Sequence, residues 1–268
     1  MLMSLYDKEK PDYLKLSIQS MVDQTVIPDE IVIVKDGIIT PEQQAVLDFF
    51  TAEYPSLFHI VGYEVNHGLG YALNFGLKHC RNELIARMDT DDIAKPTRCE
   101  KQLRCFEKKP ELDIVGGDIS EFIDVPSNIV GKRIVPKSDK AIKEYMKRRC
   151  AFNHMTVMYK KSSILKVGSY RNWYWNEDYY LWIRMVLANC SMANTGTVLV
   201  NVRVGKDMYK RRGGLKYFKS ELGLQNYMMK HKMIGILTYT ENVIKRAIVQ
   251  ILLPNSIRGW VFQKLARK

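Results

Sequence analysis

The sequence predicts an α/β fold with a mostly parallel central sheet and helices on both of its faces. Through the first 120 residues, short apolar runs alternate with segments of helical periodicity, as in parallel strands joined by helical crossovers. Carboxylates follow several of the runs directly, at Asp7, Asp36 and Asp89. Open sheets of this kind bind ligands beyond the carboxyl ends of their strands, so these positions indicate where a site lies.

The alternation begins at the first residues. The expected elements are, in chain order, a strand at 2–5, a helix at 13–24, a strand at 30–34, a helix from Pro41, a strand at 58–63, a helix at 70–80 and a strand at 84–88. The first helix is predicted from Leu14, Ile18, Met21 and Val22, whose spacing places them on one face. Pro41 suits a first helical position, where its missing N–H is not needed.

Beyond residue 96 the pattern is less regular. A helix is expected at 97–108, a strand at 113–117, a polar and irregular segment at 119–150 that ends in a basic helix, a strand at 155–159, a helix at 162–167, a helix at 179–188 and a strand at 197–204. Gly168 fits the position just after a helix end. From about residue 205 the pattern is helical and basic.

Three carboxylates end the apolar run at 84–88, namely Asp89, Asp91 and Asp92. Side chains alternate on an extended strand, so Asp89 and Asp91 point the same way. Two like charges held so close are costly unless a cation lies between them. A hard divalent cation prefers such oxygen ligands, and the run therefore predicts a metal site, with a solvated acidic turn as the alternative.

Five segments in this order resemble family 2 glycosyltransferases of the GT-A fold, of the kind that acts in bacterial capsule and O-antigen synthesis. The segments are 4–7, 29–37, 66–70, 86–92 and 177–178, within residues 1 to about 205. The resemblance implies a Rossmann-like, mixed sheet and an inverting transfer of a hexose from a UDP-sugar to a lipid-diphosphate-linked saccharide, which gives a β-linkage. It also implies Mn²⁺ or Mg²⁺ as cofactor, and UDP-glucose or UDP-galactose as the favoured donor.

The resemblance implies a role for each matching residue on the nucleotide side. Tyr6 would stack on the base, since an aromatic face suits a π-system. Asp36 would accept the uracil imide N–H, and Asn66 and Gly68 would shape a loop beside the nucleotide. Members of the family often carry a second acid where this chain has Lys35, so the base contact would depend on Asp36 alone.

The catalytic roles follow in the same way. Asp91 would be the direct metal ligand, Asp89 would lie near the ribose or behind the metal, and Asp92 would orient the acceptor side or a metal-bound water. Asp178 would be the general base, which requires hydrogen-bond reach to the acceptor hydroxyl. The alternative for Asp178 is an ordinary acidic helix start, favoured by the helix dipole.

Weaker acceptor-side candidates surround the proposed base. They are Asn153, His154, Trp175 and Glu177. A lone histidine is more often structural, and of the aromatic residues between 170 and 182 about half are expected in the core.

The net charge of +12 is concentrated at one end of the chain. Residues 1–200 hold 26 basic and 26 acidic residues, whereas residues 201–268 hold 15 basic and 3 acidic ones. Arg203, Arg211 and Arg212 could reach a diphosphate. Segment 241–268 reads as two amphipathic helices split by Pro254, which suits an anionic membrane surface. The alternative is packing on the catalytic domain or on a second copy.

We therefore expect a catalytic domain at 1–205, with a nucleotide-sugar half at 1–118 and an acceptor half at 119–205, and a basic helical extension at 206–268. The five cysteines include no C-x-x-C pair, which favours a reducing compartment. The first residues lack the features of a signal peptide, and no apolar run approaches the ~20 residues that span a bilayer. These observations predict a cytoplasmic protein, peripheral on the inner face of the membrane.

Rival classes fit less well. The G-x-G at 68–70 has Leu73 at the third glycine position of a dinucleotide-binding motif, and no P-loop occurs. A nucleic-acid-binding protein that uses the basic extension is the other alternative, but the chain carries no recognised nucleic-acid motif. No nucleic-acid partner is therefore expected, and the oligomeric state is left open, a homo-oligomer included.

Overall fold

The computed structural model describes residues 1–205 and 213–253. Its strands are β1 (Leu2–Leu5), β2 (Ile31–Asp36), β3 (Phe58–Tyr63), β4 (Leu84–Met88), β5 (Ile93–Ala94), β6 (Ile114–Phe122), β7 (Ile129–Arg133), β8 (Met158–Lys160) and β9 (Met192–Arg203). Its helices are α1 (Pro11–Val22), α2 (Pro41–Glu53), α3 (Leu69–His79), α4 (Arg98–Lys108), α5 (Asp139–Met146), α6 (Lys161–Lys166), α7 (Glu177–Leu187), α8 (Leu215–Lys230) and α9 (Ile236–Ala247). A 3-10 turn, η1 (His154–Thr156), precedes β8, and a π-helical segment, η3 (Ile248–Leu252), continues α9.

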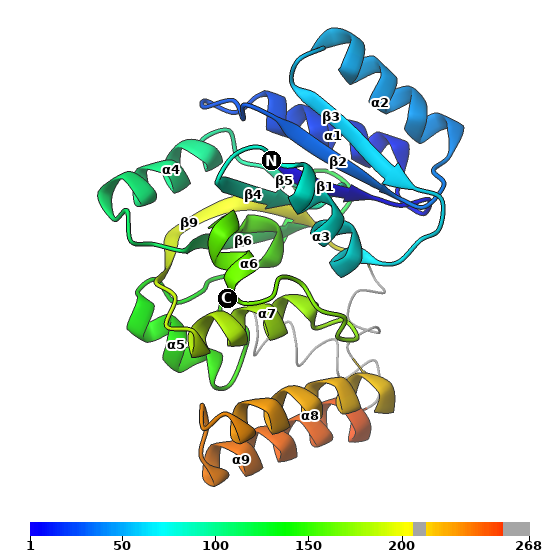
Figure 1. Cartoon of the computed structure of the whole chain (residues 1–268). Coiled ribbons are helices and arrows are strands. Elements are labelled where there is room, and N and C mark those ends of the chain that lie inside the picture. The colour runs from blue at the N-terminus through cyan, green and yellow to red at the C-terminus, as the bar shows by residue number, and fades with distance from the viewer. Residues whose placement is uncertain (206–212, 254–268) are drawn as a thin grey trace.

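One mixed sheet organises the described residues, in the order β3-β2-β1-β4-β8-β6-β9-β5, with β7 paired to β6. The first four strands pair in parallel, and β8, β5 and β7 each pair antiparallel. Met3 lies opposite Met88 in the β1–β4 pair. Because these strands run the same way, Tyr6, Asp36 and Asp89 come to one edge of the sheet (Figure 1).

Helices cover both faces of the sheet, as predicted (Figure 1). In β2, Ile31 and Ile33 pack into a core with α1, α2 and α4, whereas Val32 and Val34 pack into a second core with α3 and α7. A strand buried on both faces is a continuous apolar run rather than an alternating one. This explains why residues 31–34 are all β-branched.

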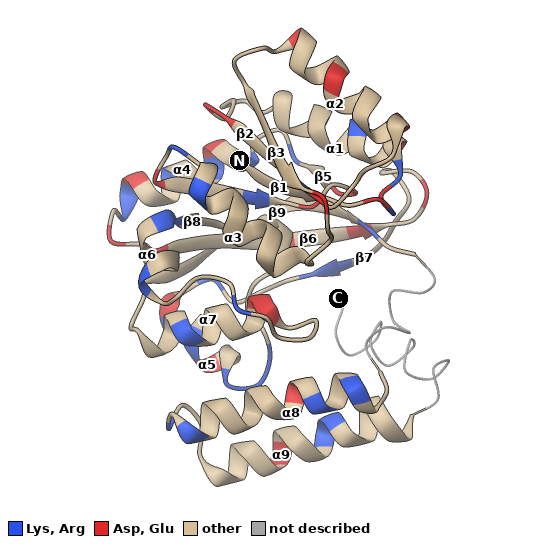
Figure 2. Cartoon of the chain, turned by 45° about the vertical axis from the view of Figure 1, so that its right-hand side comes forward, with Lys and Arg blue, Asp and Glu red and all other residues tan. Residues whose placement is uncertain are grey.

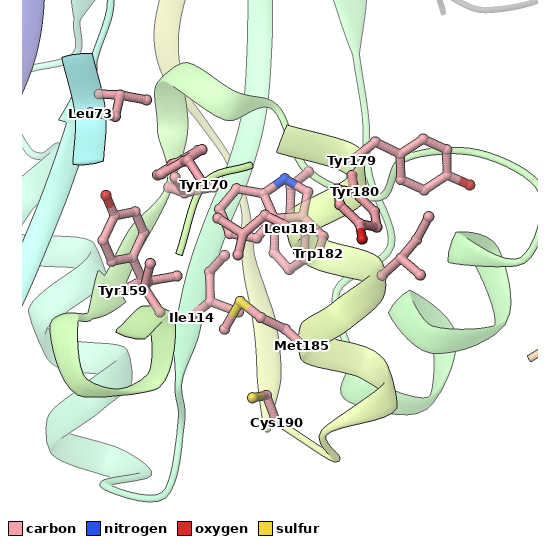
Figure 3. Close-up of a cluster of buried hydrophobic side chains, with 14 of the residues drawn as sticks. Leu73, Ile114, Tyr159, Tyr170, Tyr179, Tyr180, Leu181, Trp182, Met185 and Cys190 are labelled. Atoms are coloured by element: carbon pink, nitrogen blue, oxygen red, sulfur yellow. The ribbon is translucent and has the colours of Figure 1, made fainter. Parts of the chain in front are cut away.

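The core beneath α7 contains a group of aromatic side chains among aliphatic ones (Figure 3). Trp182 is fully buried, and its ring centroid lies 6.4 Å from that of Tyr159 and 6.5 Å from that of Tyr170. Phe152 is closer still, at 5.7 Å. These contacts fix α7 against the sheet, and with it the acidic pair at its first turn.

The expectation of an irregular segment from residue 119 is wrong. Strand β6 continues to Phe122 with every residue buried, and β7 follows it. The polar side chains in β6 concealed the strand. One of them, Asp118, is buried with a tertiary partner: its Oδ1 accepts from the backbone N–H of Val135 at 2.9 Å. Strand β9 likewise begins five residues before its expected start at 197, and β5 is too short to be recognised from sequence.

Helices α8 and α9 form an antiparallel pair, the C-terminal hairpin, on the α7 side of the molecule and away from the sheet (Figures 1 and 2). Among the residues that the structure describes, no helix has the length and apolar character needed to cross a membrane. Arg211, Arg212 and the amphipathic segment expected after Pro254 lie outside the described residues.

Candidate active site

The three aspartates that follow β4 form one cluster. Carboxylate oxygens of Asp89, Asp91 and Asp92 all lie within 4.8 Å of one another. Burial raises the pKa of Asp91 to about 7, and the charges of Asp89 and Glu9 add to the rise. Burial, and then the charge of Asp91, raise the pKa of Asp92 well above its usual value. The cluster therefore carries more negative charge than its surroundings stabilise.

A divalent cation fits this cluster. All the donors are carboxylate oxygens, which Mg²⁺ and Mn²⁺ prefer. Asp92 is 1% exposed, and its Oδ2 has no hydrogen-bond partner among the described residues. A buried carboxylate oxygen without a partner is costly, and a cation between the three side chains would remove that cost.

Sequence reasoning did not single out Arg87, which faces the same way as Asp89. Arg87 is buried and donates through Nη2 to the Asp89 carboxylate. Burial acts to lower the pKa of Arg87, but the charge of Asp89, the hydrogen bond to Asp89 and smaller contributions from Tyr170 and Asp92 together make the net change upward. The two-residue spacing on one strand was the available signal, because side chains at i and i+2 share a face.

Arg203, at the end of β9, is hydrogen-bonded to the segment that contains Asp91 and Asp92. Its backbone N–H donates to Asp92 Oδ1 at 2.9 Å, and its Nε donates to the backbone oxygen of Asp91 at 3.2 Å. Its Nη1 donates to the backbone oxygen of Asp124, and the guanidinium lies 3.7 Å from the ring centroid of Tyr13. In this structure Arg203 thus positions the aspartates, and its expected contact with a diphosphate stays a prediction.

Asp36 and the loop at 66–68 lie in direct contact. Asp36 Oδ1 accepts from the hydroxyl of Tyr63 at 2.9 Å and from the backbone N–H of His67 at 2.8 Å. Its Oδ2 accepts from the N–H of Gly68 at 3.0 Å, and Asn66 Nδ2 donates to the backbone oxygen of Asp36. Asp36 therefore orders the loop, and its contact with uracil stays a prediction.

Tyr6 and Glu9 border the same edge. The Tyr6 side chain is 39% exposed, as a stacking surface needs to be, and its backbone oxygen accepts from Gln43 Nε2 at 3.0 Å. Burial raises the pKa of Glu9, and the charge of Asp89 adds to the rise. Glu9, which lies 3.4 Å from the Thr90 hydroxyl, is a further carboxylate beside the cluster that the sequence did not reveal.

The first turn of α7 belongs to the same electrostatic environment. Burial raises the pKa of Glu177 to about 7, with the charge of Asp178 next in importance and that of Asp89 also contributing. Arg87 acts in the opposite direction. A Cβ added at Gly70 would lie 3.7 Å from the Cβ of Glu177, so the starts of α3 and α7 are neighbours. The structure thus brings Glu177 and Asp178 toward the aspartate cluster.

The remaining acceptor-side candidates lie in different environments. His154 Nε2 is 2.9 Å from the hydroxyl of Tyr170, and burial, with Arg87, lowers the pKa of this histidine well below its usual value. Trp175 is 51% exposed and adopts a positive φ of 55°. The expected contacts of His154 and Trp175 with an acceptor stay predictions.

Asn153 is buried, and both ends of its amide have partners within the protein. Its Nδ2 donates to the backbone oxygen of Gly117 at 2.8 Å, and its Oδ1 accepts from Arg133 Nη1 at 2.7 Å. These bonds join the turn before β8 to β6 and β7. Its proposed part in acceptor binding therefore stays a prediction.

The mixed, mostly parallel sheet with a carboxylate cluster at the end of β4 matches the GT-A fold, which solved structures share. The chain aligns with a Pyrobaculum calidifontis mannosyltransferase in complex with GDP-Man and Mn²⁺, with a TM-score of 0.63, 12% identity and coverage of 96% of this chain and 71% of that one. Staphylococcus aureus TarS in complex with UDP-GlcNAc aligns with a TM-score of 0.64 and 13% identity, over 92% and 72%.

The chain belongs to glycosyl transferase family 2, whose model matches residues 2–172. An uncharacterized glycosyltransferase of Haemophilus influenzae is 41% identical over 100% of this chain and 98% of its own. The UDP-Gal:α-D-GlcNAc-diphosphoundecaprenol β-1,3-galactosyltransferase of Escherichia coli is 38% identical over 100% and 96%. The amylovoran biosynthesis glycosyltransferase AmsE of Erwinia amylovora is 37% identical over 98% and 97%. The protein is thus a glycosyltransferase with bacterial polysaccharide enzymes among its relatives.

Proposed function

We propose that the protein is an inverting, metal-dependent hexosyltransferase of surface polysaccharide synthesis, of the O-antigen or capsule type. It takes a hexose from UDP-galactose or UDP-glucose and forms a β-linkage to a sugar hydroxyl of a lipid-diphosphate-linked acceptor. The carrying observation is the partly buried aspartate cluster at the end of β4. The full-length similarity to the E. coli galactosyltransferase supports the donor and the acceptor class.

Donor binding is assigned to residues 1–118. Asp91, with Asp89 and Asp92, would hold Mn²⁺ or Mg²⁺, and the cation would neutralise the diphosphate of the leaving group. The exposed ring of Tyr6 would stack on uracil. Asp36 keeps its loop in place, and each carboxylate oxygen accepts more than one hydrogen bond, so the uracil imide N–H would be an additional donor to it.

Acceptor activation is assigned to residues 119–205, with Asp178 as the general base. Asp178 would take the proton of the acceptor hydroxyl while that oxygen bonds to the anomeric carbon and the bond from that carbon to the diphosphate breaks. One displacement inverts the anomeric centre. The pKa of Glu177 is raised to about 7. When Glu177 is protonated it is neutral and can donate a hydrogen bond, whereas Asp178 acts as the base.

The segment at 206–268 is proposed to hold the enzyme on the inner face of the cell membrane. Ile244, Ile248, Ile251 and Leu252 are all exposed and follow the spacing of one helix face. Leu237, at 84% exposure, extends this apolar stripe. Lys and Arg lie on both α8 and α9 (Figure 2), and basic residues beside an apolar stripe favour an anionic bilayer. A bilayer would also present the lipid-linked acceptor.

The test is a transfer assay with a synthetic lipid-diphosphate-linked N-acetylglucosamine. The expected product from UDP-galactose or UDP-glucose is a β-linked disaccharide, identified by mass spectrometry and by its anomeric coupling in proton NMR, and its formation should stop in EDTA. Asp178→Asn should abolish transfer, whereas Asp48→Asn, an exposed change on α2, should not. Transfer that persists in Asp178→Asn, or an α-linked product, would contradict the assignment.

A further inference from the structure

The C-terminal hairpin is hydrogen-bonded to the loop that leads into α7 through Ser220 of α8. The Ser220 hydroxyl donates to the backbone oxygen of Tyr174 at 2.6 Å and accepts from Asn176 Nδ2 at 3.1 Å. The backbone oxygen of Ser220 accepts from the indole N–H of Trp173 at 3.0 Å. Three residues of the loop at 173–176 are therefore tied to a single position of the hairpin.

Asn176 immediately precedes Glu177 and Asp178, and it is the N-cap of α7. Asparagine at this position commonly caps its own helix by accepting from the first turn. Within the described chain the Asn176 side chain makes no such bond, and it donates to Ser220 instead. The start of α7 is thus located by a contact from another part of the chain.

The loop itself is strained, so its shape depends on outside contacts. Trp175 has a φ of 55°, a region that bulky residues rarely adopt. Lys216 lies 4.2 Å from the ring centroid of Tyr174, and a Cβ added at Gly223 would come within 2.9 Å of Trp173. The loop is held against one face of α8 by these close contacts.

Polar contacts hold the hairpin together and join it to the rest of the described structure. Glu221, next to Ser220, pairs with Arg246 of α9 in a mostly buried site. Asn242 of α9 donates to Gln225 and to the backbone oxygen of Lys147, both at 2.8 Å. These bonds connect α8 to α9, and α9 to the end of α5.

We propose that Ser220 is a positioning residue for the transfer reaction: through Tyr174 and Asn176 it sets where the first turn of α7, and hence Asp178, lies. The proposal rests on the role of Asp178 in the proposed function. Helix stability does not explain a serine here, because alanine is the better helix former. Both hydrogen bonds of the hydroxyl go to the loop rather than to α8.

The test compares Ser220→Ala, Ser220→Thr and Ser163→Ala in the full-length protein. Ser163 is a matched control, because it is a helical serine whose hydroxyl donates to Asp113, before β6 and away from the aspartates. In Ser220→Ala we expect kcat to fall about tenfold or more, as small displacements of catalytic groups do, with KM for the UDP-sugar unchanged within about twofold. Ser220→Thr keeps the hydroxyl and should restore kcat, and Ser163→Ala should leave it unchanged.

Amide hydrogen exchange of residues 176–179 gives a readout that does not depend on activity. It should become faster in Ser220→Ala and stay unchanged in Ser163→Ala. Wild-type kcat in Ser220→Ala, or unaltered exchange at 176–179, would overturn the role of Ser220. If the wild-type protein transfers no sugar, the proposed function is wrong, and the role of Ser220 fails with the proposed function. If the wild type is active and Ser220→Ala is equally active, only the role of Ser220 is rejected.

Discussion

Replacing Asp91 with asparagine should make the metal-free protein more stable at pH 8 while abolishing its response to metal. Burial and two nearby carboxylates raise the pKa of Asp91 from 3.8 to about 7. When the pKa of an acid is higher in the folded state than in the unfolded state, the folded protein binds more protons at any pH between the two pKa values. Stability is therefore lost as pH rises from about 4 to about 7.

The size of the effect follows from the pKa difference. Each pKa unit corresponds to about 1.4 kcal/mol, so the shift costs about 4 kcal/mol at pH 8 and under about 2 kcal/mol at pH 5. These values are upper limits, because Asp91 keeps some contact with solvent, which screens its charge. Asparagine has nearly the same shape without the charge, so Asp91→Asn should regain most of this free energy.

The assay is urea denaturation of wild type and Asp91→Asn in EDTA at pH 5 and pH 8, repeated with Mn²⁺. In EDTA, the free energy of unfolding of Asp91→Asn should exceed that of the wild type by more at pH 8 than at pH 5. Only the wild type should be stabilised by Mn²⁺. Asp48→Asn, on the exposed face of α2, controls for the loss of an ordinary carboxylate. A variant less stable than wild type at pH 8 in EDTA would refute the electrostatic reasoning.

Three further changes test other parts of the structure. Arg87→Met should abolish transfer and lower stability by about 3 kcal/mol in urea denaturation, because it leaves the partly buried carboxylate of Asp89 without its cation. Trp182→Ala should cost about 3–5 kcal/mol in the same measurement, since it empties the centre of the aromatic core. Leu237→Asp should leave the melting temperature unchanged and weaken co-sedimentation with anionic vesicles about tenfold, since an exposed leucine that enters a bilayer contributes about 1.5–3 kcal/mol. Ile38 is also highly exposed, on the β2–α2 loop, and Ile38→Asp should bind vesicles like the wild type. Equal loss of binding in both variants would contradict a specific docking face.

The parts of the fold that sequence predicted are those whose signals are local. The β-branched run at 31–34 and the helix-spaced apolar residues of α1 each depend on neighbours in the chain, and their predicted ends differ from the structure by at most two residues. Asp89 and Asp91 were placed together by the two-residue repeat of a strand. Asp36 was placed near the aspartates by its position at the end of a strand, whereas its contacts with the loop at 66–68 were not predicted.

The parts that sequence did not predict depend on contacts between distant segments. Arg203 lies more than 110 residues from Asp91, and only the pairing of β5 with β9 brings them together. The polar residues of β6 resemble a loop in the sequence, and only the pairing of β6 with β9 and the bond from Val135 to Asp118 show them to be part of a buried strand. Ser220 has no motif at all, because its role arises from the packing of α8 on the loop before α7.

The central claim is a metal-dependent uridine nucleotide site, and isothermal titration with UDP, GDP and CDP tests it most directly. With Mn²⁺, wild type should bind UDP and show no comparable binding of GDP or CDP. Binding of UDP should disappear in EDTA and in Asp91→Asn. The absence of any nucleotide binding under both conditions, or equal UDP binding by Asp91→Asn in EDTA, would contradict the assignment of the site.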